Sequence, residues 1–280
     1  MLNPKRKRSF LAAGYLVYDF VRRAYWKISG GRKETVFGEK FSFSPSTHYP
    51  AYRGLRLPEG GVLDASVRYG DYVQVHSAFL FLQELSHAPL VVDVGAHHGI
   101  YAVLLGKLVQ RKKGKLIAVE PNPVAFRVLQ ENVVSNGLSD TVICENIAVM
   151  ETSGTMRLAL HDDQSYVVRG DVSNSVSVNA LAMSELLKKY SVGNVDLLLI
   201  DVEGAELNVL RSIEWRSTKI GRIFCELHPY NWKLYGYSGK EVSSFLKEHN
   251  YRCVDMYLRE LREFPGEAYL GPTWFISGQQ

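Results

Sequence analysis

Strand-like apolar runs alternate with helix-like segments along most of this 280-residue chain. Five runs carry the pattern: PLVVDV (89–94), KLIAVE (115–120), TVICENIAV (141–149), VDLLLID (195–201) and RIFCELHP (222–229). Shorter extended pieces at 155–160 and 175–181 interrupt the alternation after the third run. Apolar runs of this length are typical of strands buried on both faces, so the pattern predicts a mostly parallel α/β sheet covered by helices on both sides.

The two ends of the chain differ from this alternating region. Two strand-like runs, YRCVDMYL and AYLGPTWFIS, close the sequence and are expected to pair as an antiparallel hairpin. We divide the chain into a basic helical extension (1–33), an irregular lead-in (34–75) and one main domain (76–280), which a helix near 77–85 introduces. A chain of this length can bury a substantial core in a single domain.

Positive charge is concentrated at the N-terminus. Residues 1–33 hold nine Lys or Arg and one acid, which leaves 24 basic against 28 acidic residues in the remainder. The high isoelectric point therefore gives the main domain no reason to bind nucleic acid, and no nucleic-acid partner is expected.

The sequence favours a cytoplasmic protein. No run reaches the roughly 20 apolar residues that a membrane-spanning helix needs. KRKR followed by an apolar stretch is similar to the start of a signal peptide, but Asp19, Arg22 and Arg23 follow at once and no small-residue cleavage site appears. Residues 5–28 are expected either to pack on the domain or to touch an anionic membrane surface. The three widely spaced cysteines are expected to be reduced thiols.

Polar residues and glycines gather where the predicted strands end. Asp93, Gly95 and Gly99 mark the end of the first strand, Glu120 the second, Asn146 the third, Asp201 and Glu203 the fourth, and Glu226 and His228 the fifth. The carboxyl ends of parallel strands meet at one edge of the sheet, where open α/β folds bind ligands. The sequence therefore predicts a nucleotide-like cofactor site at this edge.

The first turn discriminates between cofactors. Gly95 and Gly99 are spaced Gly-x-x-x-Gly, whereas a dinucleotide site needs Gly-x-Gly-x-x-Gly to seat a pyrophosphate on a helix N-terminus. Asp93 suits a cationic ligand, and Glu120 is placed to accept both hydroxyls of a ribose. This combination disfavours a nicotinamide dehydrogenase and favours S-adenosylmethionine, which carries a sulfonium and an ammonium.

DVGAHHG, VEPNP, ENIAV, IDVEGAE and ELHP, in this order, resemble the FkbM-type family of S-adenosylmethionine-dependent methyltransferases. The resemblance extends from about Leu90 to the C-terminus. It implies a Rossmann-like, seven-stranded, mostly parallel sheet with an antiparallel last strand, and O-methylation of a hydroxyl on a sugar, polyketide or related small molecule. The chain departs from the family at His97, where Asn is common, at His98, where an apolar residue is common, and at Trp274, where Asn is frequent.

Two sets of residues are assigned to this reaction. The cofactor-binding set is Asp93, Gly95, His97, Gly99, Glu120, Asn146 and Asp201, and the catalytic set is His228, Asp201 and Glu226. Methyl transfer requires an acceptor oxygen held in line and a group that takes its proton, and a neutral His228 suits that role near pH 7. The alternatives for His228 are ordering the ELHP turn by hydrogen bonding and binding the acceptor.

The remaining candidates also have structural alternatives. Asp201 either binds the methionyl ammonium, orients the acceptor or caps the helix that follows, and Glu226 serves either the site or a structural ion pair. Glu203 and Glu206 are expected to share a helix face, one reaching the site and the other solvated. The aromatic candidates for an acceptor-binding lid are Tyr230, Trp232 and Tyr235, with a packed loop as the alternative.

No metal is assigned. A Mg²⁺ site is the alternative, with ligands from Asp201, Glu203, Glu226 and His228. The adjacent His97 and His98 make a poor zinc site because no third ligand is near in the sequence. His97 is expected to hydrogen-bond near the methionyl end of the cofactor, and His98 to pack under the turn or face the acceptor.

The leading hypothesis is an S-adenosylmethionine-dependent O-methyltransferase that acts on a small-molecule hydroxyl with a histidine or carboxylate base. A nucleic-acid methyltransferase is disfavoured because DVEG follows the fourth strand, where methylation of a base amine favours an NPPY-like turn. The third alternative is a non-catalytic cofactor-binding module whose basic arm associates with membranes. The sequence leaves the oligomeric state open.

Overall fold

The computed structural model describes residues 32–36, 39–44, 70–160, 166–168, 175–255, 259–264 and 271–278. The basic extension expected over 1–33 and most of the lead-in expected over 34–75 lie outside the described residues. Inside them are a hairpin of β1 (Arg32–Val36) and β2 (Glu39–Phe43), and a helix α2 (Gly70–Glu84). The helix expected at 77–85 is therefore longer, and the boundary drawn at residue 76 falls within it.

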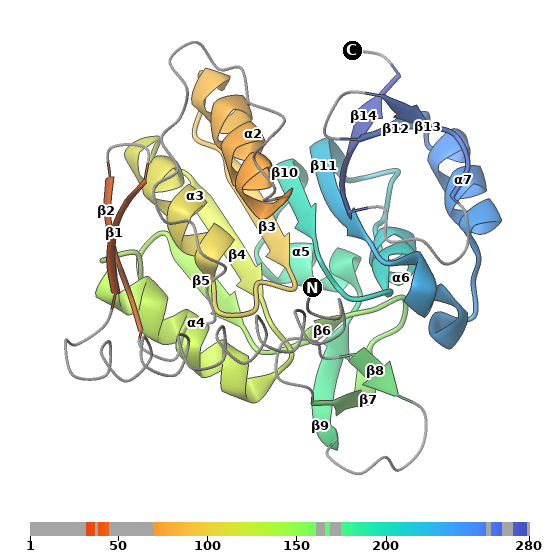
Figure 1. Cartoon of the computed structure of the whole chain (residues 1–280), viewed down its shortest axis with the longest axis horizontal. Coiled ribbons are helices and arrows are strands. Elements are labelled where there is room, and N and C mark those ends of the chain that lie inside the picture. Colours follow the sequence, from red (N-terminus) through yellow and green to blue (C-terminus); the bar gives the residue numbers. More distant parts are fainter. Residues whose placement is uncertain are drawn as a thin grey trace, which may run out of the picture.

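An eight-stranded sheet forms the centre of the described structure (Figure 1). In spatial order its strands are β13 (Glu260–Leu261), β12 (Tyr251–Asp255), β14 (Gly271–Ser277), β11 (Lys219–Leu227), β10 (Asn194–Ile200), β3 (Leu90–Val94), β4 (Lys115–Val119) and β5 (Val142–Glu145). The strands from β11 to β5 are parallel, and β14 is antiparallel to both β11 and β12. The Rossmann-like sheet with a C-terminal antiparallel hairpin is confirmed, and the two-residue β13 adds a short edge to the seven strands expected.

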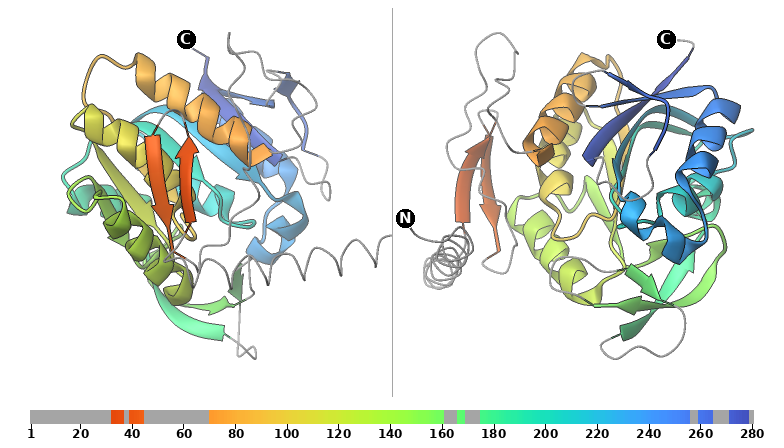
Figure 2. Two further views of the ribbon diagram at one scale, coloured as in Figure 1. Left: turned by 60° about the vertical axis from the view of Figure 1, so that its left-hand side comes forward. Right: turned by 45° about the vertical axis from the view of Figure 1, so that its right-hand side comes forward.

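Helices cover both faces of this sheet (Figure 2). Besides α2 they are α3 (Ile100–Arg111), α4 (Pro123–Ser135), α5 (Met183–Lys189), α6 (Glu206–Arg211), the 3₁₀ helix η1 (Pro229–Tyr235) and α7 (Gly239–Glu248). Alternate residues of each strand point to opposite faces. Val91 and Leu197 join α2, α3 and α4 in one core, whereas Val92 and Leu198 join α5, α6 and α7 in the other. Burial on both faces explains why the strands read as continuous apolar runs.

Two helix starts follow the local signals in the sequence. The side chain of Asn122 accepts two backbone N–H groups of the first turn of α4, with Pro123 at the first helical position. Ser238 and Glu241 form the expected capping box at the start of α7.

In the described part of the chain, none of the helices combines the length and apolar character needed to cross a bilayer.

The third apolar run does not form one strand. Its first half is β5 of the large sheet, whereas Ala148–Val149 forms β6 of a second sheet. That sheet has the order β6-β9-β7-β8, with β7 (Gly154–Ala159), β8 (Tyr166–Val168) and β9 (Ser175–Leu181). The break lies at Asn146, whose amide donates to the carbonyls of Glu120 (2.7 Å) and Pro121 (3.1 Å).

Candidate cofactor and acceptor site

A pocket opens at the carboxyl ends of β3, β4 and β10. It holds about 750 Å³ of space, counting the open solvent at its mouth, which suits a nucleoside-sized ligand. Its polar lining comes from Gly95, His97, Glu120, Asp201 and Glu203 at the strand ends. Its apolar wall comes from Ile147, Ala148, Val149 and Leu158 in and beside the second sheet. The two sheets together therefore make a pocket with one polar and one apolar side.

The two glycines of the first turn are required by the protein's own packing. Gly95 has φ 89° and Gly99 has φ 77°, both in the left-handed region that favours glycine. A Cβ on Gly95 would overlap the backbone carbonyl oxygen of Asp201, and a Cβ on Gly99 would overlap the side chain of Leu129. The turn after β3 thus lies directly against the turn after β10.

Glu120 joins the first and second turns. Its Oε2 accepts from the backbone N–H of His97 (2.8 Å) and its Oε1 accepts from that of Asn122 (2.7 Å). Burial raises the pKa of Glu120 to about 7, against the lowering effect of these two hydrogen bonds. Each oxygen keeps a second lone pair, so this carboxylate is able to accept ligand hydroxyls as well.

Asp93 carries a buried oxygen that the described residues leave without a hydrogen-bond partner, Oδ2. The residue is 2% exposed, and burial together with the charge of Glu120 raises its pKa to about 7. An unpaired buried carboxylate oxygen is costly, and an ammonium group would satisfy it. The unsatisfied oxygen of Asp93, the hydrogen-bonding capacity of Glu120 and the apolar wall fit the ammonium, the ribose hydroxyls and the adenine of S-adenosylmethionine.

His97, His98 and Asn146 hold the turns around the pocket. His97 lines the pocket with a φ of 48°, unusual for a residue other than glycine, and its ring stacks on that of His98 with centroids 3.9 Å apart. Asn146 is exposed and supports Glu120 and Pro121 from behind. Of the cofactor-binding set, Gly95, His97, Glu120 and Asp201 thus line the pocket. Asp93 lies in β3, Gly99 is the N-cap of α3, and Asn146 lies between β5 and β6.

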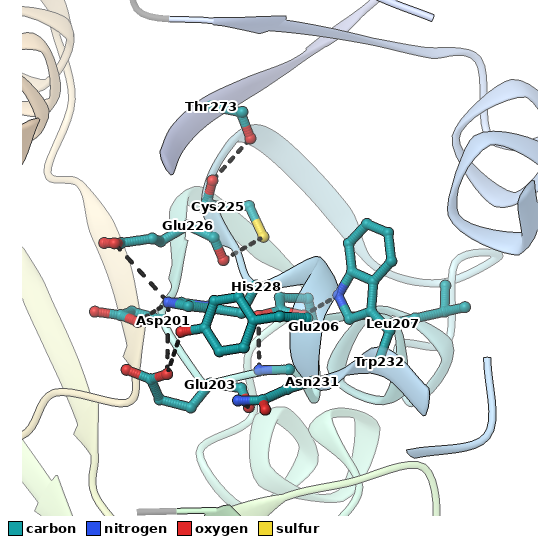
Figure 3. A network of polar contacts seen from close by, with 12 residues as sticks. Asp201, Glu203, Glu206, Leu207, Cys225, Glu226, His228, Asn231, Trp232 and Thr273 are labelled. Atoms are coloured by element: carbon teal, nitrogen blue, oxygen red, sulfur yellow. Dashed lines mark hydrogen bonds and ion pairs between the residues drawn. The ribbon is translucent and has the colours of Figure 1, made fainter. Parts of the chain in front are cut away.

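Four carboxylates surround His228 at the end of β11 (Figure 3). Its Nδ1 lies 2.8 Å from Glu206 Oε1. Its Nε2 lies 3.8 Å from Asp201 Oδ1, 3.7 Å from Glu203 Oε2 and 3.9 Å from Glu226 Oε1. Burial alone would lower the pKa of His228, but the hydrogen bond to Glu206 and the charges of Asp201, Glu206 and Glu203 raise it to about 10. The imidazole is therefore a cation at neutral pH.

Glu206 is a site residue that sequence reasoning placed wrongly. Glu203 precedes α6 with a φ of 51°, so the two glutamates do not share a helix face. Glu206 is 1% exposed rather than solvated. Besides His228 it accepts from Trp232 Nε1 (2.7 Å) and Tyr237 OH (3.2 Å). These donors arrive from η1 and the loop after it, so no local pattern marks them in the sequence.

Asp201 is directed to the pocket rather than to a helix end. The N-cap of α6 is Ala205, which excludes the alternative that Asp201 caps this helix. Its side chain is 39% exposed and lines the pocket beside Glu203. Glu226 is 9% exposed and faces His228, so its contact is with the charged cluster.

The aromatic residues of η1 divide between two tasks. Tyr230 is 40% exposed, donates to Glu203 Oε2 (3.2 Å) and meets the ring of His228 edge-on. Tyr235 lines the pocket. Trp232, which is 1% exposed, anchors Glu206. Trp274 packs edge-on against Phe224 in the core, at a centroid distance of 4.6 Å.

One cluster in the described residues has the spacing of a metal site. Asp201, Glu203 and His228 each offer a ligand atom, and these atoms lie within 4.8 Å of one another. Carboxylate oxygens with one neutral imidazole nitrogen suit a divalent cation, so His228 would have to release its proton to bind one. The cluster is therefore the place to test for the Mg²⁺ alternative.

The match to known families decides the identity of the fold. Residues 93–253, more than half of the chain, match the family model of the Methyltransferase FkbM domain. The chain belongs to the FkbM methyltransferase family. This family membership confirms the resemblance seen in the sequence, the class of methyltransferase fold and the assignment of S-adenosylmethionine as cofactor.

Two curated relatives are similar to this chain. The hexuronic acid methyltransferase AglP of Haloferax volcanii is 26% identical over 174 residues, which span 60% of this chain and 66% of AglP. The methyltransferase sdnD of Sordaria araneosa is 24% identical over 166 residues, which span 48% of this chain and 63% of sdnD. The chain thus matches slightly less than two thirds of the length of each relative.

Among solved structures, a methyltransferase FkbM from Methylobacillus flagellatus KT is similar to this chain. The TM-score is 0.43 with 14% sequence identity, over 67% of this chain and 43% of that one.

Proposed function

We propose that this protein is an S-adenosylmethionine-dependent O-methyltransferase that acts on a hydroxyl of a small molecule such as a sugar, a polyketide or a related glycoconjugate. The observation that carries the proposal is the shared pocket, in which the carboxylates of Asp201 and Glu203 lie next to the turn of Gly95. An acceptor hydroxyl held by these carboxylates stands beside the cofactor. The name of the relative AglP supports a sugar-type acceptor.

The residues that would hold the cofactor are Asp93, Glu120 and the backbone of the turn from Gly95 to Gly99. Bound S-adenosylmethionine supplies a methyl group on a sulfonium, and its thioether leaving group needs no acid. The protein must therefore do two things. It must orient the oxygen of the acceptor hydroxyl, and it must provide a group that takes the proton of that hydroxyl.

The positions of Asp201 and His228 relative to the pocket favour a carboxylate over a histidine as the base. Asp201 lines the pocket, whereas His228 lies behind it at 2% exposure. A histidine whose pKa is about 10 already holds its proton at neutral pH and cannot take another. We assign Asp201 as the group that accepts the hydrogen bond and then the proton of the acceptor.

His228 and Glu226 then act as positioning residues. The imidazolium of His228 lies 3.8 Å from Asp201 and 3.9 Å from Glu226, so it draws both carboxylates to one place and offsets their mutual repulsion. Glu206 fixes the ring from the other side through Nδ1. Tyr230, at the exposed edge of the cluster, offers an aromatic face and a hydroxyl to a polyhydroxylated acceptor.

Transfer of a labelled methyl group to a panel of sugars and polyketides, each with its hydroxyls blocked in a matched control, tests the function. We expect label only on compounds with a free hydroxyl, and unchanged transfer after treatment with EDTA. Absence of transfer to every hydroxyl compound, or label on nucleic acid instead, would overturn the proposal.

The pH profile separates the two possible bases. Asp201→Asn should lower kcat by about 100-fold or more, as expected for loss of a general base. His228→Gln should lower kcat at all pH values without removing a limb of the profile. If His228→Gln alone removes an ionisation near neutral pH, the base is His228.

We also propose that the protein is cytoplasmic and that residues 5–28 contact anionic membranes. Residues 1–33 contain nine basic residues and one acid, and this positive charge supports the contact. Co-sedimentation with vesicles containing phosphatidylserine should exceed that with phosphatidylcholine alone, and should fail in about 0.5 M salt, where the Debye length is only a few ångströms. Equal binding to both vesicle types argues against the contact.

A further inference from the structure

The strand β2 is built into the core of the domain. Phe41 and Phe43 are 3% and 1% exposed and belong to the core that also holds α3 and α4. Figure 2 shows the β1–β2 hairpin lying across these helices. A segment that the sequence assigned to an irregular lead-in therefore packs on α3, the helix that follows the turn from Gly95 to Gly99, which we call the cofactor turn.

Side chains of α4 and of its C-cap residue, Asn136, hold β2 and the residue after it by hydrogen bonds. The amide of Asn136 accepts from the backbone N–H of Ser42 (2.9 Å) and donates to the carbonyl of the same residue (2.7 Å). Ser44, two residues after Ser42, donates its backbone N–H to Asn132 Oδ1 (2.6 Å). The hydroxyl of Ser44 donates to Glu131 Oε2 (2.6 Å). Ser42 in β2 and Ser44 just after it thus pair with polar side chains at the C-terminal end of α4.

Asn132 also contacts the cofactor turn. Its Nδ2 donates to the backbone carbonyl of His98 (2.7 Å), and the residue is 0% exposed. His98 lies between Gly95 and Gly99, next to His97, whose φ of 48° needs support from its surroundings. One buried amide therefore bridges Ser44 and the turn that lines the pocket.

We propose that Asn132 is a positioning residue for cofactor binding, because it couples the docking of the β1–β2 hairpin to the geometry of the turn from Gly95 to Gly99. Asn136 docks the same strand, but within the described residues its side chain bonds to Ser42 and Asn132 and not to the turn, so it separates docking from coupling. The proposal rests on the cofactor of the family and is independent of the acceptor and of the base.

The test compares Asn132→Asp with Asn136→Asp in the full-length protein. Aspartate keeps the acceptor for Ser44 but replaces the donor to His98 by a carboxylate oxygen, which leaves a buried carbonyl unsatisfied. We expect the Kd for S-adenosylmethionine to rise about tenfold or more in Asn132→Asp. Asn136→Asp should lower the melting temperature at least as much, yet change this Kd by no more than about twofold.

Two results would overturn the proposal: an unchanged Kd in Asn132→Asp, or a rise in Kd that follows the loss of stability equally in both variants. Should Asn132→Asp fail to fold, amide hydrogen exchange in the wild-type protein gives the answer, because coupling is reciprocal. S-Adenosylmethionine should then slow exchange of the Ser44 amide, which donates to Asn132. No change at Ser44 on saturation with the cofactor contradicts the coupling.

Discussion

Glu206 and His228 form a hydrogen bond of 2.8 Å between two side chains that are almost completely buried. The carboxylate lies at the start of α6, the helix that follows β10, and the imidazole lies at the end of β11. The hydrogen bond therefore connects the segments that follow these two neighbouring strands. Trp232 and Tyr237 complete the surroundings of Glu206 with a neutral donor each.

Replacing Glu206 with Gln should destabilise the protein by about 3–5 kcal/mol, the usual cost of removing one partner of a buried ion pair. The new amide would also turn a donor toward His228 or Trp232, each of which donates to this position. Urea unfolding measures the change. Glu203→Gln is the matched control, since Glu203 faces the same imidazole at 3.7 Å from a partly exposed position and should cost about 1 kcal/mol or less. Equal losses would argue against a special role for Glu206.

The stability of the protein without ligand should fall as the pH rises from about 4 to 7. Burial raises the pKa of Asp93 from 3.8 to about 7 and that of Glu120 from 4.5 to about 7. In this window the folded state holds protons that the unfolded state has released, so the free energy of unfolding decreases with increasing pH. Urea unfolding at several pH values measures the slope, and Asp93→Asn should reduce it. A steeper slope in Asp93→Asn would contradict the assignment.

Cofactor binding should strengthen over the same range. A cationic ligand favours the ionised forms of Asp93 and Glu120, so binding lowers their pKa and releases protons when the pH is below about 7. Calorimetric titration with S-adenosylmethionine in two buffers of different ionisation enthalpy detects this release. We expect the Kd to fall as the pH rises toward about 7 and to level off above that value. Proton uptake on binding would show that these carboxylates are not beside the cation.

Gly95→Ala should impair folding as well as binding. The added Cβ would overlap the carbonyl oxygen of Asp201, and the φ of 89° strains any other residue. Gly193→Ala is the control, because a Cβ on Gly193 would meet nothing within 4 Å. We expect a lower melting temperature and no detectable S-adenosylmethionine binding in Gly95→Ala, with little change in Gly193→Ala. Normal binding by Gly95→Ala would mean that the two turns are not in contact.

Local patterns in the sequence predicted the sheet and the pocket edge correctly. Strand-ending residues such as Asp93, Glu120 and Asp201 follow continuous apolar runs, and parallel strands must bring their ends together. The start of α4 was predictable for a similar reason, because Asn122 and Pro123 act within one turn of helix. In each case the signal and its structural effect lie within a few residues.

The features that the sequence did not reveal depend on contacts between distant segments. Glu206 accepts hydrogen bonds from Trp232 and Tyr237, which come from η1 and the loop after it, and Asn132 accepts one from Ser44, which is 88 residues away in the sequence. The alternation of Phe41 and Phe43 was a usable signal for β2, but the strand has only five residues. Neither the spacing nor the composition of the sequence indicates such long-range contacts, because they form only when the helices and strands pack together.

The second sheet has a consequence for how the pocket can change. In the described structure it shares no strand with the large sheet, yet Ala148, Val149 and Leu158 from its strands β6 and β7 form part of the apolar wall of the pocket. Substitutions at these three positions can therefore reshape this wall without altering the register of the parallel strands. Changes in the size of these side chains can therefore alter which molecules the pocket admits while the turn from Gly95 to Gly99 stays unchanged.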